Sequence, residues 1–124
     1  MKIEKIFEKG RLFSDKQEVN FESIEWQESP TAQGVFLKHL VKKEQTEGLF
    51  SYHLVKILPH CKIPAHFHAY QLETHEVIAG AGICICKGKE RNYCPGTISI
   101  LPAQCEHEVI AKEQGLYLFA KFIP

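Results

Sequence analysis

Turn-forming residues recur at short intervals and divide the chain into short apolar runs. Clear examples are Ser29-Pro30, Glu47-Gly48, Leu58-Pro59, Cys94-Pro95-Gly96 and Leu101-Pro102. The runs between them are rich in β-branched and aromatic residues, and none keeps a helical apolar period over the about ten positions that a helix needs. This pattern is typical of short strands joined by turns, so we expect an all-β fold.

The length of 124 residues fits one domain rather than two. About ten short strands in a single domain favour a sandwich, a jelly roll or a barrel, because these architectures bury one sheet face and limit exposed edges. We expect the barrel to span residues 34–124. Residues 1–33 are harder to interpret and are predicted to form N-terminal strands or an arm.

The composition argues against several classes of partner. Lysine plus arginine equals aspartate plus glutamate, at 15 residues each, and the basic residues form no stripe, so no nucleic-acid partner is expected. The N-terminus mixes charged with apolar residues, unlike a signal peptide. The longest apolar run, from Val77 to Cys86, is about half the ~20 residues that a membrane span requires. We therefore expect neither export nor a membrane-spanning segment.

The cysteine pattern bears on the compartment. The cysteines are odd in number and lack CxxC spacing, so a reduced, cytoplasmic protein fits better than a disulfide framework. They are Cys61, Cys84, Cys86, Cys94 and Cys105.

The segment from Pro64 to Gly80 gathers several polar side chains of one chemical kind. His66 and His68 are two residues apart, so on a strand they point the same way, about 7 Å apart at the backbone. Glu73 has the wrong parity for that strand, so residues 69–72 are expected to turn the chain into a neighbouring strand. On this second strand Glu73 and His75 share a face, which predicts that they lie near the histidine pair.

Two interpretations of these residues are open. The histidines are either exposed or hydrogen-bonded structural residues, or they are metal ligands with Glu73 beside them. The metal interpretation is favoured by a further histidine in the segment from Cys94 to Ala111. There Pro95-Gly96 opens a strand, Pro102 ends it and His107 starts the next, which is how a distant ligand returns to the mouth of a barrel.

These two segments resemble the two motifs of the cupin superfamily. The first runs His66-Phe67-His68, four residues, Glu73, six residues and Gly80, and it meets each spacing of the first motif. The second runs Gly96, TISIL and Pro102 to His107, with Gln104 where the family usually has glycine. The resemblance extends from about residue 58 to residue 124.

The resemblance implies a double-stranded β-helix, the small jelly-roll barrel of the cupins. It also implies one metal ion, held by His66, His68, Glu73 and His107. It implies no single activity, because cupins include enzymes, binding modules, sensors and storage proteins.

Three imidazoles and one carboxylate suit a divalent ion such as Fe, Mn, Ni, Co or Zn. Four protein ligands saturate a tetrahedral zinc, whereas an octahedral ion keeps two positions for water or substrate. His75 is then either the catalytic residue, as a general base near the metal, or a residue that orients Glu73.

Two functional hypotheses follow. The first is a small metalloenzyme acting on a polar metabolite that chelates the metal, such as a sugar derivative, a hydroxy acid or a diketone. The second is a non-catalytic binding or sensing cupin, in which the metal orients the ligand. We also expect a homodimer, because small cupins commonly pair through N-terminal strands and the arm carries Val19, Phe21, Ile24 and Trp26.

Overall fold

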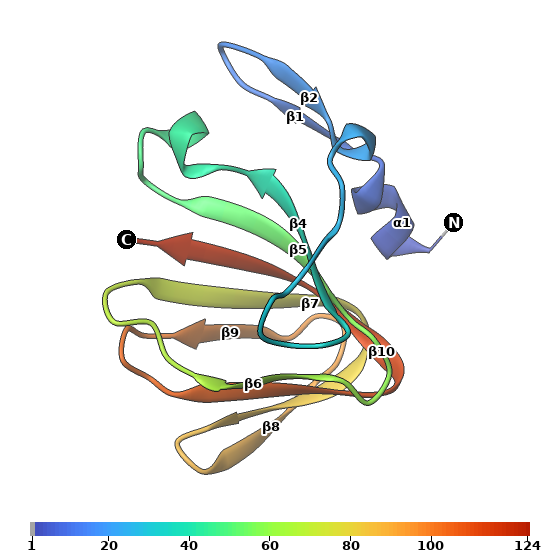
Figure 1. Ribbon diagram of the computed structural model, residues 1–124, viewed down its shortest axis with the longest axis vertical. Coiled ribbons are helices and arrows are strands. Elements are labelled where there is room, and N and C mark those ends of the chain that lie inside the picture. The colour runs from blue at the N-terminus through green and yellow to red at the C-terminus, as the bar shows by residue number, and fades with distance from the viewer. Residues whose placement is uncertain (1) are drawn as a thin grey trace.

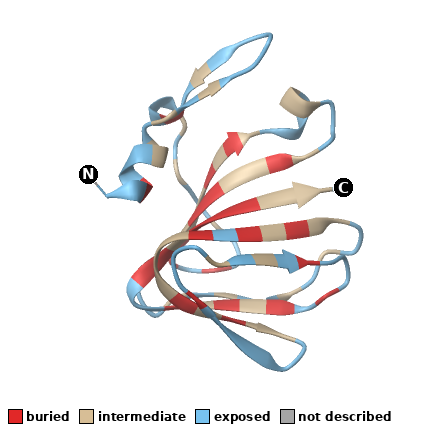
Figure 2. Ribbon diagram, turned by 180° about the vertical axis from the view of Figure 1, so that it is seen from behind, coloured by how far each residue is buried: buried red, intermediate tan, exposed pale blue. Residues whose placement is uncertain are grey.

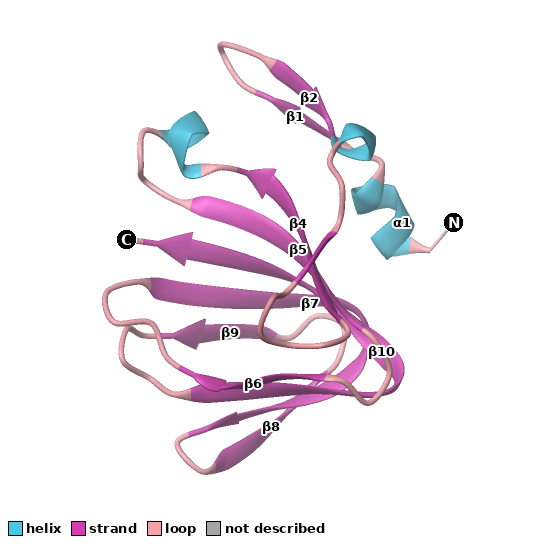
Figure 3. Ribbon diagram, in the orientation of Figure 1, coloured by secondary structure: helices cyan, strands magenta, loops and turns pink. Residues whose placement is uncertain are grey.

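The computed structural model describes residues 2–124 and contains ten strands, one short α-helix and two 3-10 turns. Figure 1 labels the helix and strands along the chain, and Figure 3 shows that helical segments occur only near the N-terminus and between two strands of the barrel. In order, the elements are α1 (Ile3–Glu8), β1 (Arg11–Phe13), β2 (Glu18–Asn20), η1 (Phe21–Ser23), β3 (Gln27–Glu28), β4 (Val35–Val41), η2 (Lys43–Thr46), β5 (Ser51–Ile57), β6 (Lys62–His66), β7 (Leu72–Cys86), β8 (Lys89–Tyr93), β9 (Ile98–Leu101) and β10 (His107–Ile123).

Two long strands, β7 and β10, run antiparallel through the whole barrel and carry most of the other strands. The main sheet has the order β3-β4-β5-β10-β7-β8, while β6 pairs with β10 and β9 pairs with β7. The first part of β7 pairs with β9, and its last part pairs with β8. Each long strand therefore serves both halves of the barrel, and the sheet stays open because β3 and β8 do not meet.

The long strands bend where glycines bring their backbones together. Gly80 has φ of +83°, a conformation that favours glycine, and a Cβ there would collide with the carbonyl oxygen of Gly115. The register of β7 with β10 shifts between Ala111 and Leu116, next to this contact. The glycine that ends the first motif thus allows β7 to pass from one half of the barrel to the other.

The alternating side chains of these strands form two apolar clusters. Figure 2 shows buried residues recurring along β7 and β10. The inner cluster fills the barrel, with Val55, Ile57, Val77, Val109, Leu116 and Leu118 among its buried members. The outer cluster contains Phe21, Leu40, Leu54 and Phe119. Strand alternation therefore places one set inside the barrel and the other on its outer face.

The N-terminal segment covers this outer face. Phe7 of α1 packs edge-to-face on Phe119 at 4.8 Å between ring centroids, and Phe21 lies buried in the same cluster. Trp26 is also part of it, with Lys56 Nζ 4.3 Å from its ring centroid. The sequence did not predict α1, because six residues are too few to show a helical period.

The all-β double-stranded β-helix that the sequence predicts is confirmed. Of the apolar residues of the arm, Phe21, Ile24 and Trp26 pack on the barrel of their own chain. The domain boundary at residue 34 and the homodimer stay predictions. Within residues 2–124, no helix is both long enough and apolar enough to cross a bilayer.

Candidate metal centre

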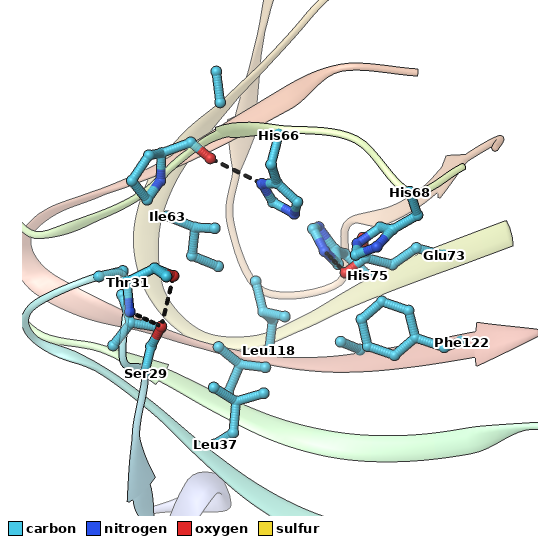
Figure 4. A pocket seen from close by; sticks show the side chains of 16 residues that line it. Ser29, Thr31, Leu37, Ile63, His66, His68, Glu73, His75, Leu118 and Phe122 are labelled. Carbon is cyan, nitrogen blue, oxygen red and sulfur yellow. Dashed lines mark hydrogen bonds and ion pairs between the residues drawn. The ribbon is translucent and has the colours of Figure 1, made fainter. Parts of the chain in front are cut away.

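Strand pairing brings the two sequence motifs together at one end of the barrel. His66 ends β6 and pairs in register with His107, the first residue of β10. Glu73 lies on β7, and His68 lies in the loop between β6 and β7. The ligand atoms of these four residues all lie within 4.8 Å of one another. Figure 4 shows His66, His68 and Glu73 converging beside a cavity.

The turn before His107 is fixed to the first motif. Gln104 has φ of +67° and takes the left-handed conformation that a glycine adopts easily, although this costs other residues about 1–2 kcal/mol. Its backbone N–H donates to the carbonyl oxygen of His68 at 2.7 Å. The departure from the family motif at this position therefore leaves a left-handed turn in place.

Backbone carbonyls orient two of the histidines. His66 Nδ1 lies 2.8 Å from the carbonyl oxygen of Pro64, and His107 Nδ1 lies 3.0 Å from that of Cys105. A carbonyl oxygen only accepts, so both Nδ1 atoms carry the proton in these bonds. When the imidazoles are neutral, each Nε2 keeps a free lone pair, which is the form that binds metals.

The two oxygens of Glu73 have different partners. Oε2 lies 2.9 Å from His75 Nε2, and His75 Nδ1 lies 2.8 Å from the Tyr93 hydroxyl. Because an ionised carboxylate only accepts, His75 Nε2 donates to Glu73, and Tyr93 donates to the Nδ1 atom of neutral His75. Oε1 faces the cluster, 3.2 Å from His68 Nε2 and 3.0 Å from His107 Nε2.

These inward-facing atoms have no hydrogen bonds despite being so close. Residues 2–124 contain four buried side-chain polar atoms without a hydrogen-bond partner, and three of them are His68 Nε2, Glu73 Oε1 and His107 Nε2. Leaving such atoms unpaired costs about 1–3 kcal/mol each. A cation among them would contact all three, so the residues fit a metal ion of the kind that the cupin resemblance implies.

The charges in the cluster suit the same interpretation. Burial opposes ionisation of Glu73, but the close approach of His107 and the hydrogen bond from His75 outweigh it and hold the pKa of Glu73 below its usual value. Burial lowers the pKa of His68 and so favours its neutral form. Burial also opposes protonation of His107, but Glu73 and the Cys105 carbonyl outweigh it and raise the pKa of His107. At acid pH a proton on His107 therefore competes with a metal ion.

The cluster opens into a cavity of about 510 Å³ with mostly apolar walls. Ser29 and Thr31, whose hydroxyl oxygens lie 3.3 Å apart, are on the side opposite His68 and Glu73 in Figure 4. Within residues 2–124, no lysine or arginine lines this cavity. Its apolar lining comprises Ala32, Val35, Leu37, Val55, Ile63, Pro64, Ala65, Leu118, Ala120 and Phe122.

His75 contacts the Oε2 atom of Glu73 and also lines the cavity, although only 2% of the residue is exposed. Both of its ring nitrogens are hydrogen-bonded. This arrangement favours the alternative in which His75 orients Glu73, while its role as a general base stays a prediction. Sequence reasoning missed Tyr93, because it lies 18 residues from His75 and in neither motif.

A second histidine pair, His39 and His53, lies on β4 and β5. Their Nδ1 atoms are 2.7 Å apart, His39 Nε2 is 3.2 Å from Gln27 Oε1, and His53 Nε2 is 2.9 Å from Ser51 Oγ. Sequence analysis gave these histidines no ligand role. Each of their ring nitrogens has a hydrogen-bond partner, whereas Nε2 of His68 and Nε2 of His107 have none.

Solved structures with the same fold are numerous. The chain matches a RmlC-like cupin from Shewanella frigidimarina with a TM-score of 0.71 and 15% identity, over 83% of this chain and 86% of that one. It matches KdgF from Halomonas sp. with a TM-score of 0.72 and 21% identity, over 86% and 90%. It matches the polyketide cyclase RemF from Streptomyces resistomycificus with a TM-score of 0.73 and 18% identity, over 87% and 78%.

No protein-family model and no curated protein matches the sequence. At these identities, the structural matches show that the chain has the cupin fold.

Proposed function

We propose that the protein is a metal-dependent enzyme that holds one divalent ion through His66, His68, Glu73 and His107. The observation that carries this proposal is the set of three buried, unpaired atoms that face one another. Polar atoms buried in this way are normally hydrogen-bonded. Similarity to a polyketide cyclase and to other cupins supports a role in small-molecule chemistry.

The cavity narrows the class of ligand. A sugar exposes hydroxyl groups on all sides, and most of them would lose water against the apolar walls without gaining a partner. A diketone needs polar contacts only where its oxygens chelate the metal, and its remaining surface can pack on Leu37, Leu118 and Phe122. Of the ligand classes that the sequence suggests, we propose an uncharged chelator with an apolar body.

The residues at this site have different proposed roles. His66, His68, Glu73 and His107 would hold the divalent ion, which would supply Lewis-acid polarisation of a bound oxygen. Glu73 balances part of the charge, and His75 holds the Oε2 atom of Glu73 so that Oε1 faces inward. The apolar walls exclude water, which strengthens electrostatic interactions inside the cavity.

Ligand binding can be tested with protein loaded in turn with Fe, Mn, Ni, Co and Zn. Thermal unfolding is measured with an aryl β-diketone and with a sugar acid of similar size. We expect the diketone to raise the melting temperature of a loaded form and the sugar acid to leave it unchanged. A larger effect of the sugar acid would contradict the proposed ligand class.

Turnover is followed in the same samples by ultraviolet loss of the diketone chromophore. Turnover that requires the metal supports the enzyme. Metal-dependent binding without turnover by any loaded form across a panel of chelating metabolites would favour the binding or sensing alternative. That alternative gains support from His75, whose nitrogens are both already hydrogen-bonded.

A further inference from the structure

Two cysteines meet beside the turn that leads into His107. Cys86 is the last residue of β7, and Cys105 lies in the turn between β9 and β10. Their Sγ atoms are 2.8 Å apart, within about 0.8 Å of the ~2.05 Å length of a disulfide bond. Because Cys86 pairs in register with His107, the sheet itself holds the two thiols together. Among residues 2–124, the other three cysteines make no such contact with a second sulfur.

The two thiols differ in how they can be reached. Cys86 is half-buried and lines a surface hollow beside β8 and β9. Cys105 is 6% exposed and lines a second hollow with Lys87 and Glu106. A small reagent therefore meets Cys86 more readily than Cys105, while Cys105 is placed to react with whatever forms on Cys86.

We propose that Cys86 and Cys105 are a modification site, at which a small-molecule disulfide oxidises the dithiol to an intramolecular disulfide. Cys86 loses its proton and attacks one sulfur of the reagent, which releases one small thiol and leaves a mixed disulfide on Cys86. Cys105 then loses its proton and attacks the Cys86 sulfur, which releases the second small thiol. The two protein thiols are oxidised, and the one small disulfide is reduced to two thiols.

The crosslink has a defined structural effect. It ties the turn before β10 to the end of β7 and closes the chain segment from residue 86 to residue 105. The carbonyl of Cys105 accepts the hydrogen bond from His107 Nδ1, so the crosslink also restrains the group that orients His107. A crosslink of this kind restricts the unfolded chain, so the oxidised protein should melt at a temperature several degrees higher than the reduced protein.

The number and spacing of the cysteines gave no sign of this pair. The expectation of a reduced protein rested on an odd count and on the absence of CxxC spacing. Cys86 and Cys105 are 19 residues apart and meet only because the chain returns alongside β7 as β10. The proposal concerns the reactivity of the pair and is independent of the metal and of the proposed enzyme activity.

The test is incubation of the purified full-length protein with oxidised glutathione, followed by peptide mapping without reduction. We expect a peptide pair linked through Cys86 and Cys105, with no glutathione left on either. Thermal unfolding of the same sample should show the higher melting temperature, which reduction by dithiothreitol reverses. A product that carries glutathione on Cys86 and lacks the linked peptide pair would overturn the proposal.

Two variants make the test more specific. In Cys105→Ser the reaction should stop at the mixed disulfide, so that glutathione stays on Cys86. Cys94→Ser is the matched control, because Cys94 is exposed and its Sγ lies 3.5 Å from Thr97 Oγ1. It should form the Cys86–Cys105 disulfide as the wild type does. The wild-type map decides the question even if the Cys105 variant fails to fold.

Discussion

The protein contains two histidine clusters in one barrel, and they differ in how their ring nitrogens are satisfied. In the pair on β4 and β5, His39 and His53 lie within hydrogen-bonding distance of each other, of Gln27 and of Ser51. In the cluster at the meeting of the two motifs, Nε2 of His68 and of His107 are buried and unpaired beside Glu73 Oε1. The number of histidines in a cluster therefore does not identify the functional site. Buried polar atoms that face one another without hydrogen-bond partners do identify it.

The largest expected effect is loss of the metal when one inward-facing ligand is removed. In His107→Ala, only three of the four ligand side chains remain, and β10 no longer supplies a nitrogen that can bind the metal. We expect metal affinity to fall by more than the roughly 100-fold that loss of a supporting residue causes. Titration of metal-free protein with Co²⁺, followed by visible absorption, measures this. If the variant bound Co²⁺ as tightly as the wild type, the proposed difference between the two histidine clusters would be wrong.

A smaller loss of metal affinity is expected when a residue that helps to orient Glu73 is changed. In Tyr93→Phe, the hydroxyl that donates to His75 Nδ1 is removed, while the ring that fills the core remains. Because such supporting residues set the orientation of ligands, the affinity for Co²⁺ should fall by about 10–100-fold.

The corresponding test of His75 uses His75→Gln with the metal bound. A lower rate at full metal occupancy would support proton transfer by this residue. An unchanged rate at full occupancy would leave orientation of Glu73 as its only role. Weaker Co²⁺ binding, with an unchanged rate once metal is saturating, is the result that the geometry predicts.

The second histidine pair supplies the matched control. His53→Leu leaves His39 Nδ1 and Ser51 without their partner, so the free energy of unfolding should fall by about 1–3 kcal/mol. The affinity for Co²⁺ should be unchanged, because the pair contributes no atom to the metal cluster. Urea unfolding and the same Co²⁺ titration measure the two effects. A large loss of Co²⁺ affinity would mean that the clusters are not independent.

The smallest effect concerns pH. Burial, with a further contribution from His39, lowers the pKa of His53 to about 4, whereas an unfolded histidine titrates near 6.5. Between these values the unfolded chain binds more protons at this position than the folded chain, so stability rises with pH. The stability that His53 contributes in its neutral, buried form is complete above about pH 6.5 and is lost as the pH falls toward 4. In His53→Leu, urea midpoints should fall less over this window than in the wild type; an equal fall would contradict the assignment.

The sequence predicts the barrel and the convergence of the metal cluster for a physical reason. Strand parity places His66 and His68 on one face, and the motif spacing returns Glu73 and His107 to them. Gly80 also follows from the motif, and the structure explains it by its close contact with Gly115. These features depend on local geometry and on short spacings, which sequence patterns record.

The remaining features depend on contacts between distant residues. Tyr93 reaches His75 through pairing of β7 with β8, and Cys105 reaches Cys86 through the return of β10. The helix α1 is too short to show periodicity and gains its place by packing Phe7 on the outer face. The left-handed conformation of Gln104 was not predicted either, because the sequence has glutamine where the motif has the glycine that favours this conformation.

The proposed function requires that His66, His68, Glu73 and His107 bind a metal ion. The most direct measurement is elemental analysis of the protein purified from its native host, without an added metal or a metal-affinity tag. We expect about one divalent ion of Fe, Mn, Ni, Co or Zn per chain, and far less in His107→Ala prepared in the same way. Wild-type protein that carries no metal, and takes up none on titration with all five ions, would contradict the proposed function.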